Sequence, residues 1–189
     1  MVDLHDVEAL FQDKTHILKH SMNVAHEIGG IAKQYLLDPE ICETSAFCHD
    51  LGGIYSPEEM MEKAAALDWP LDPAEIQHPF LLHQHFSAMI CRERLHIEDV
   101  RILEAVGCHT TLKANPSAYD MVLYIADKLA WDQPGAPPYN KNVREALAVS
   151  LEAACLSHID FVLSNGMILT PHTWLLEARN CLIPYAACS

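Results

Sequence analysis

A single stretch, Phe47-Cys48-His49-Asp50-Leu51-Gly52-Gly53, decides how the whole sequence is interpreted. It sets a His beside an Asp, followed by two glycines of the kind that end a helix as a C-cap. Adjacent residues on a helix point about 100° apart, so both can hold one ion only near a helix end or through a bridging carboxylate. The dipeptide alone is a weak signal, because a surface His-Asp at a helix end has the same sequence.

Composition limits the class of protein. The chain has 189 residues, half of them apolar, and a formal net charge of −14, so we expect one domain over 1–189. That charge argues against partners that are nucleic-acid polymers or anionic membrane surfaces, since both need a basic face. The seven cysteines form no C-x-x-C pair and the N-terminus lacks a signal-peptide pattern, which favours a cytoplasmic protein with reduced thiols.

The hydrophobic periodicity predicts an all-α protein, because apolar residues recur at three- and four-residue steps and no run alternates as a strand would. Asp38-Pro39, Ser56-Pro57 and Asp72-Pro73 are typical helix starts, the last two within capping boxes. The expected helices cover about 7–11, 16–36, 39–50, 57–67, a short piece after 73, 81–95, 99–109, 121–127, 142–163 and a last helix starting at Thr170-Pro171.

Six residues of metal-ligand type lie on the inward faces or ends of these helices. His20 lies on an apolar stripe, where a hydrogen-bonded core histidine is the alternative. Asp127 follows six apolar residues and is costly to bury unless paired or metal-bound; a helix-end carboxylate near Lys128 is the alternative. Imidazoles with carboxylates suit Fe, Mn, Co, Ni or Zn. The full set is His20, His49, Asp50, His83, His109 and Asp127.

Two histidines compete for one place in this set. His83 and His85 are two residues apart, so on a helix they point about 200° apart and only one can face the site. We assign His83, because it precedes His109 by twenty-six residues in the pattern described next.

The arrangement of these six residues resembles that of the HD-domain metal-dependent phosphohydrolases. It is more similar still to the YqeK-type branch, the symmetrical diadenosine tetraphosphate hydrolases, over nearly the whole chain. The specific matches are Phe47-Cys48-His49-Asp50, the His83 to His109 spacing, Cys108-His109-Thr110-Thr111, and Tyr124-Ile125-Ala126-Asp127 eighteen residues after His109.

This resemblance implies an HD-domain helical bundle with two metal ions, with Fe as the first choice and Mn, Ni or Zn as alternatives. One ion would be held by His20, His49, Asp50 and Asp127, and the other by Asp50, His83 and His109, with Asp50 bridging. His49 and Asp50 would be the catalytic residues. The implied reaction cuts diadenosine tetraphosphate to two ADP, with a nucleotide as the only partner besides a possible homodimer.

Three departures from the branch pattern bear on the substrate. The branch has a Lys where Gly53 stands, an Arg where Gln133 stands, and Gly-Pro where Leu112-Lys113 stand. Thr110, Lys113 and Lys128 are therefore our candidates for substrate binding. The alternatives are hydrolysis of another nucleoside phosphate and a non-catalytic metal- or nucleotide-binding HD module. Trp131 and Tyr139, in a Pro-rich loop after Asp127, could stack on a base or only anchor the loop.

Overall fold

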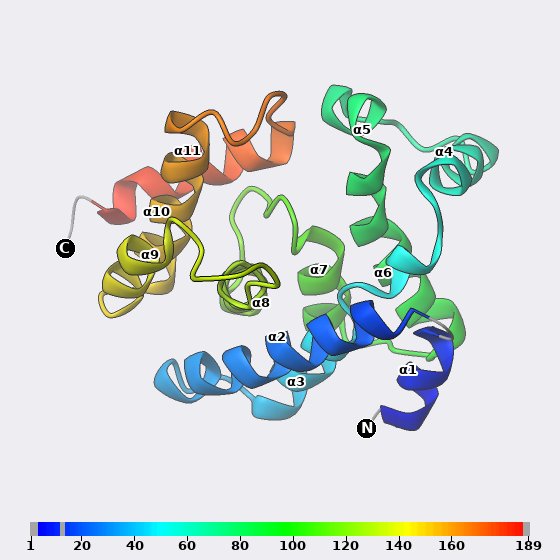
Figure 1. Ribbon diagram of the computed structural model, residues 1–189, viewed down its shortest axis with the longest axis horizontal. Coiled ribbons are helices and arrows are strands. Elements are labelled where there is room, and N and C mark those ends of the chain that lie inside the picture. Colours follow the sequence, from blue (N-terminus) through cyan, green and yellow to red (C-terminus); the bar gives the residue numbers. More distant parts are fainter. Residues whose placement is uncertain (1–3, 12–13, 187–189) are drawn as a thin grey trace.

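The computed structural model describes residues 4–11 and 14–186, and within these ranges it contains helices and no strand, which confirms the all-α prediction (Figure 1). The elements are α1 (Leu4–Phe11), α2 (Thr15–Gln34), α3 (Pro39–Cys48), the 3-10 helix η1 (Leu51–Ile54), α4 (Pro57–Ala66), α5 (Pro73–Gln77), the 3-10 helix η2 (Pro79–Leu82), α6 (His83–Arg94), α7 (Val100–Cys108), α8 (Ala118–Leu129), α9 (Asn140–Leu147), α10 (Leu151–Ser164) and α11 (Thr173–Ala186). No described helix is long and apolar enough to cross a membrane.

The helix starts follow from local side-chain chemistry. The Asp38 carboxylate accepts a hydrogen bond from the Glu40 N–H, with Pro39 in the first turn of α3. Ser56 and Asp72 each form a complete capping box, with Glu59 and Glu75 reaching back to the cap backbone. These caps satisfy N–H groups that a helix leaves without partners, so the predicted starts are confirmed.

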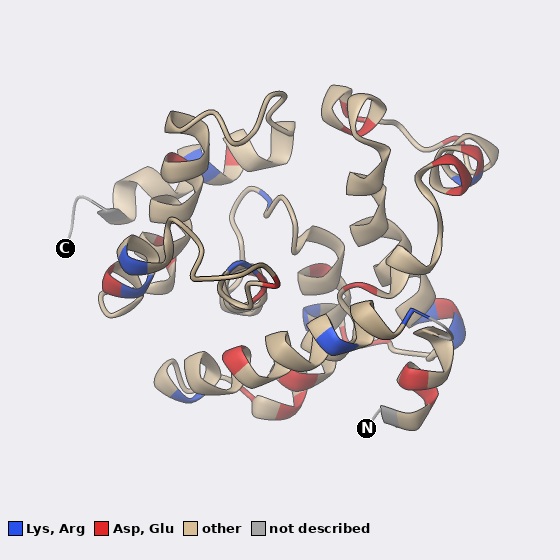
Figure 2. Cartoon of the chain, viewed as in Figure 1, with Lys and Arg blue, Asp and Glu red and all other residues tan. Residues whose placement is uncertain are grey.

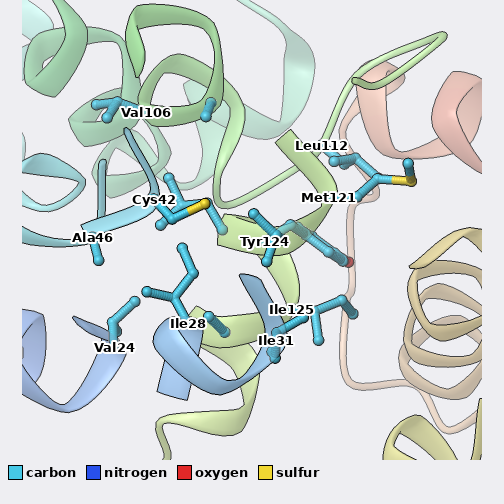
Figure 3. Close-up of a cluster of buried hydrophobic side chains, with 14 of the residues drawn as sticks. Val24, Ile28, Ile31, Cys42, Ala46, Val106, Leu112, Met121, Tyr124 and Ile125 are labelled. Atoms are coloured by element: carbon cyan, nitrogen blue, oxygen red, sulfur yellow. The ribbon is translucent and has the colours of Figure 1, made fainter. Parts of the chain in front are cut away.

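Helix α8 is the centre of the core. It packs against α2, α3 and α7 on one side and α10 on the other. Seven consecutive residues, Asp120–Ala126, are buried, so the helix is enclosed on every side. Figure 3 shows Met121, Tyr124 and Ile125 among side chains from α2, α3 and α7. This enclosure fixes where the last turn of α8, which carries Asp127, lies.

The prediction of one long helix over 142–163 is wrong. The chain forms α9 and α10 instead, with a break at Ser150. Ser150 is extended (φ −162°, ψ 165°), and its Oγ accepts a hydrogen bond from the Ala153 N–H at 3.0 Å. A serine N-cap competes with continuation of a helix. The apolar periodicity continues on both sides of Ser150, so the pattern predicted one helix without a break.

The two glycines after His49-Asp50 do not act as the predicted C-cap. Helix α3 ends at Cys48, and neither glycine has a positive φ. Gly52 instead allows η1 to approach α6 closely, because a Cβ there would lie 2.1 Å from the His83 carbonyl oxygen. The Gly52 N–H also donates to Ser87 Oγ at 2.8 Å. The glycine therefore serves the contact between η1 and α6, the helix that begins with His83.

Candidate metal centre

The six candidate ligands come from five separate helices and meet at one place. His49 and His109 cap the C-terminal ends of α3 and α7, and His83 is the first residue of α6. Asp50 lies between α3 and η1, His20 lies within α2, and Asp127 lies in the last turn of α8. Helix ends leave room for an ion between side chains, and here the ends of α3 and α7 converge with the start of α6.

Asp50 divides the site into two halves. Its Oδ1 lies 3.2 Å from His83 Nε2 and 3.4 Å from His109 Nε2. Its Oδ2 lies 3.5 Å from His49 Nε2 and 3.9 Å from His20 Nε2. Two metal-ligand sets therefore share this carboxylate, one with His20 and His49 and the other with His83 and His109. A carboxylate placed in this way could bridge two ions, one held by each set.

Backbone carbonyls orient three of the histidines. Nδ1 of His49 lies 2.7 Å from the Ala46 carbonyl oxygen, Nδ1 of His83 lies 2.6 Å from that of Phe80, and Nδ1 of His109 lies 2.8 Å from that of Val106, each three residues earlier in the chain. A carbonyl can only accept, so Nδ1 carries the proton in all three rings and Nε2 is left as a lone pair in the neutral form. These carbonyls orient the ligands as hydrogen-bond partners behind metal-binding histidines do.

The surroundings of three Nε2 atoms are what a metal ion would explain. His49 Nε2 is buried and makes no hydrogen bond. His83 Nε2 and His109 Nε2 lie 3.0 Å apart, although both face inward as lone pairs when neutral. Two such atoms repel unless a proton or an ion lies between them. The donor set therefore fits two ions of the Fe, Mn, Ni or Zn type.

Asp127 completes the half of the site that contains His20 and His49. Its Oδ1 lies 3.0 Å from His20 Nε2 and 3.7 Å from His49 Nε2. Its Oδ2 accepts a hydrogen bond from Lys128 Nζ at 2.6 Å. The sequence left a metal-ligand role and a pairing with Lys128 as alternatives for Asp127, and the structure shows Oδ1 facing the two histidines and Oδ2 paired with Lys128.

The charges of the site are strongly coupled. Burial favours the neutral form of Asp50, but the attraction of His49 and the contacts with His109 and His83 outweigh burial and hold its pKa well below the usual range. Burial likewise opposes the charged form of His20, yet its hydrogen bond to Asp127 and the nearby carboxylates raise its pKa to about 9. Burial lowers the pKa of His109 to about 4. The carboxylates are thus ionised and His109 is neutral near pH 7, as metal ligands must be, whereas His20 would have to lose a proton to bind an ion.

The HD domain family matches residues 17–132, a range that includes all six ligand-type residues. The chain belongs to the HD domain family. This assignment, together with the two ligand sets, supports a metal-dependent phosphohydrolase.

The relatives of this HD domain protein were found by sequence and by structure. It is 39% identical to the "uncharacterized protein in pepC 5′ region" of Lactococcus lactis subsp. cremoris, over 71% of this chain and 68% of that one. It is 26% identical to the symmetrical bis(5′-nucleosyl)-tetraphosphatase of Halalkalibacterium halodurans, over 84% and 85% of the two chains. A crystal structure from Clostridium acetobutylicum, described as a predicted HD superfamily hydrolase involved in NAD metabolism, aligns with a TM-score of 0.80 and 25% identity over 96% and 95%.

The three residues proposed for substrate binding lie in different surroundings in this HD domain protein. Thr110 Oγ1 lies 3.2 Å from His83 Nε2 and 3.1 Å from His109 Nε2, beside the second ligand set. Lys128 pairs with Asp127, and Lys113 pairs with Glu104 at 2.8 Å and Asp120 at 3.2 Å. Thr110 is thus at the centre, whereas both lysines already have carboxylate partners. Their substrate roles stay predictions.

The loop after Asp127 contains one residue that the sequence did not indicate and two that it left open. Asp132 Oδ2 lies 2.6 Å from His20 Nδ1. No sequence signal marks it, because it lies in a loop without periodicity. Tyr139 is buried and donates a hydrogen bond to the Lys128 carbonyl at 3.1 Å, so it anchors the loop on α8. Trp131 stays partly exposed beside it.

His85 lies away from the metal centre, on the other side of α6. Its Nε2 lies 2.8 Å from Glu75 Oε1, and His172 Nε2 lies 3.5 Å from the same oxygen. This cluster lies in a groove of about 820 Å³ between α6 and the start of α11, with Trp69 and Trp174 against His85. Glu75 thus links α5 to α6 and to the segment before α11, a connecting role remote from the ligand sets.

Proposed function

We propose that this HD domain protein hydrolyses a phosphoanhydride bond of a nucleotide, with symmetrical cleavage of diadenosine tetraphosphate as the first substrate to test. The observation that carries this proposal is the placement of Asp50, with one carboxylate oxygen facing each ligand set. The tetraphosphatases of Halalkalibacterium halodurans and Bacillus subtilis, 26% and 23% identical, support the choice of substrate.

The proposed cofactor is a pair of Fe ions, with Mn, Ni or Zn as alternatives, one on each side of Asp50. Two bound ions about 3.5–4 Å apart can activate a water and stabilise the charge that develops on the leaving oxygen. The chain supplies the positioning, because the histidine rings are oriented by fixed backbone carbonyls. The charge balance also fits, because two dications more than offset Asp50 and Asp127 and make the site attractive to phosphate despite a net charge of −14.

Thr110 is the residue that we propose to contact the substrate at this centre. Its hydroxyl lies next to His83 and His109 and can both donate and accept a hydrogen bond. We propose secondary contacts from Lys113 and Lys128, each of which would have to leave a carboxylate partner in part. Because an existing ion pair must be broken in part, each lysine should contribute less to phosphate binding than an unpaired lysine would.

A second candidate function is hydrolysis of a smaller nucleoside phosphate at the same centre. It is favoured by Gly53 and Gln133, which stand where the tetraphosphatase branch has Lys and Arg, and by the neighbour described as involved in NAD metabolism. A third candidate is a binding module without catalysis, for which the ions would serve only structure.

The proposed partner is a nucleotide alone. Figure 2 shows Lys and Arg scattered along the helices among the more numerous Asp and Glu. Such a surface does not favour a nucleic-acid polymer or an anionic membrane as a partner. A homodimer and a cytoplasmic location stay predictions, as does a single domain over 1–189.

The test is product analysis with protein loaded separately with Fe²⁺ or Mn²⁺. Water attack at the centre of diadenosine tetraphosphate gives two ADP, whereas asymmetrical attack gives AMP and ATP. ADP as the sole product supports the first candidate. Fast hydrolysis of nucleoside diphosphates with slow hydrolysis of diadenosine tetraphosphate favours the second candidate function. Metal-loaded protein that hydrolyses neither substrate favours the third, a binding module. His49→Ala and Asp50→Ala serve as inactive controls.

A further inference from the structure

One ligand histidine differs from the other three in how its ring is held. His49, His83 and His109 each use a backbone carbonyl three residues earlier, which is available because they lie at helix boundaries. His20 lies well inside α2, which spans Thr15–Gln34, so the preceding carbonyls are engaged in helical hydrogen bonds. Its Nδ1 therefore needs a partner from elsewhere in the chain.

That partner is the carboxylate of Asp132, from the loop after α8. Its Oδ2 lies 2.6 Å from His20 Nδ1, and its Oδ1 accepts a hydrogen bond from Asn23 Nδ2 at 3.4 Å. The oxygen at Nδ1 lies off the axis of an ideal hydrogen bond, so the contact is electrostatic in character. Because Asn23 lies one turn after His20 on α2, the two side chains together hold Asp132 against that helix.

The opposite ring nitrogen faces the metal site. His20 Nε2 lies 3.0 Å from Asp127 Oδ1 and 3.9 Å from Asp50 Oδ2. A neutral imidazole can present Nε2 as a ligand only when Nδ1 carries the proton. A carboxylate at Nδ1 stabilises that tautomer and makes Nε2 more basic, as in carboxylate–histidine–metal groups.

We propose that Asp132 is a positioning residue of the metal centre, which fixes His20 in the tautomer and orientation that present Nε2 to the ion shared with His49 and Asp50. This inference rests on the proposed metal-dependent function. It gives the loop after α8 a direct influence on one half of the centre. The half formed by Asp50, His83 and His109 has no contact with Asp132 among the described residues and should be unaffected.

The experiment measures metal binding without substrate. Protein stripped with a chelator is titrated with Mn²⁺ by calorimetry, and free Mn²⁺ is followed by electron paramagnetic resonance, so both sites are counted. For wild type we expect two ions, and His20→Ala identifies the site that depends on His20. Asp132→Ala should weaken that same site about 10–100-fold and leave the other within twofold. Asp132→Asn, which keeps an acceptor without the charge, should lie between.

Matched variants separate positioning from general damage. Gln133→Ala alters the next residue of the same loop and should bind both ions as wild type does, whereas Asn23→Ala should weaken the His20 site less than Asp132→Ala. If Asp132→Ala binds both ions with wild-type affinity, or weakens both equally, the role of Asp132 is refuted. If wild type itself binds no Mn²⁺, Fe²⁺ or Zn²⁺, the proposed function fails instead.

Discussion

His83 and His85 are two residues apart on α6 and face opposite sides of that helix. His83 Nε2 lies 3.2 Å from Asp50 Oδ1 in the metal centre, whereas His85 Nε2 lies 2.8 Å from Glu75 Oε1 in the groove beyond α6. The sequence predicted this division from the 100° step of a helix, since one face cannot carry both rings.

The first prediction uses this pair. His83→Ala should remove one ligand set, lowering the bound metal towards one ion per chain and the turnover at least about 100-fold. His85→Ala should keep two ions and nearly full turnover, because it loses only the contact to Glu75. Metal analysis of purified protein together with kcat checks both variants. Normal turnover in His83→Ala with loss in His85→Ala would refute the assignment.

The second prediction concerns the shared carboxylate. Because each oxygen of Asp50 faces a different ligand set, Asp50→Asn should weaken both ions, whereas His20→Ala should weaken one. Metal titration of the stripped protein distinguishes a loss at two sites from a loss at one. Loss of a single ion in Asp50→Asn would show that the carboxylate does not bridge.

The convergence of the six candidate ligands could be predicted from sequence because most of them lie where helices end. His49-Asp50 and His109 lie at helix ends, and Asp127 follows the run that becomes the buried α8. Asp132 could not be predicted in this way. Its contact with His20 depends on the path of an irregular loop, and neither its neighbours nor its spacing indicates that path.

Two features of the fold could not be predicted from sequence for similar reasons. The break at Ser150 depends on one side-chain hydrogen bond that interrupts an otherwise continuous apolar pattern. The role of Gly52 depends on a tertiary contact, since the atom it avoids belongs to His83, thirty-one residues later. Local sequence rules predicted a helix cap there, and packing determined a different role.

The third prediction tests that packing. A Cβ at position 52 would lie 2.1 Å from the His83 carbonyl oxygen, so Gly52→Ala must displace η1 from α6. Overpacking of this kind costs about 1–3 kcal/mol or more, and the displacement should also weaken the ion at His83. Urea unfolding and metal titration measure the two effects.

Gly29→Ala is the matched control for Gly52→Ala. It lies within α2 with open space around its Cβ, so it should stabilise the protein by up to about 1 kcal/mol. If Gly52→Ala is as stable as wild type, the close contact is not a constraint.

The fourth prediction is a pH dependence that comes from Glu75. Burial would raise the pKa of this carboxyl, but the nearby His172 ring and the hydrogen bond from His85 outweigh burial and lower its pKa from 4.5 to about 2. A depressed pKa stabilises the fold fully above pH 4.5, and this stabilisation is lost as the pH falls towards 2. The shift corresponds to a contribution on the order of 3 kcal/mol at neutral pH.

Glu75→Gln should therefore be less stable than wild type at pH 7, and the difference should shrink as the pH falls towards 2. Glu59→Gln is the control, because Glu59 fills the same capping-box position in α4 without histidine partners, and Gln can keep the cap. Urea unfolding between pH 2.5 and 7 measures both variants. A constant difference between Glu75→Gln and wild type across this range would contradict the assigned charge interaction.

The fifth prediction concerns substrate selectivity. Gln133 is exposed and follows Asp132, which contacts His20, so an added cation at position 133 would lie near the His20 half of the site. An Arg bound to phosphate contributes about 1.5–3 kcal/mol, which is roughly ten- to a hundredfold in binding. Gln133→Arg should therefore raise kcat/KM for diadenosine tetraphosphate by about that factor and raise kcat/KM for ADP less, because a shorter phosphate chain reaches the loop less well.

Gly53→Lys restores the other cation that the branch carries, but this variant is expected to fold poorly. Gly53 is buried, and a Cβ at this position would lie 3.0 Å from Ile17 Cδ1. Asn180→Arg on α11 adds the same charge on a helix that carries none of the ligands and should change neither substrate. Equal gains for Gln133→Arg and Asn180→Arg would mean that the effect is one of net charge, and no gain for either would show that position 133 does not reach the phosphates.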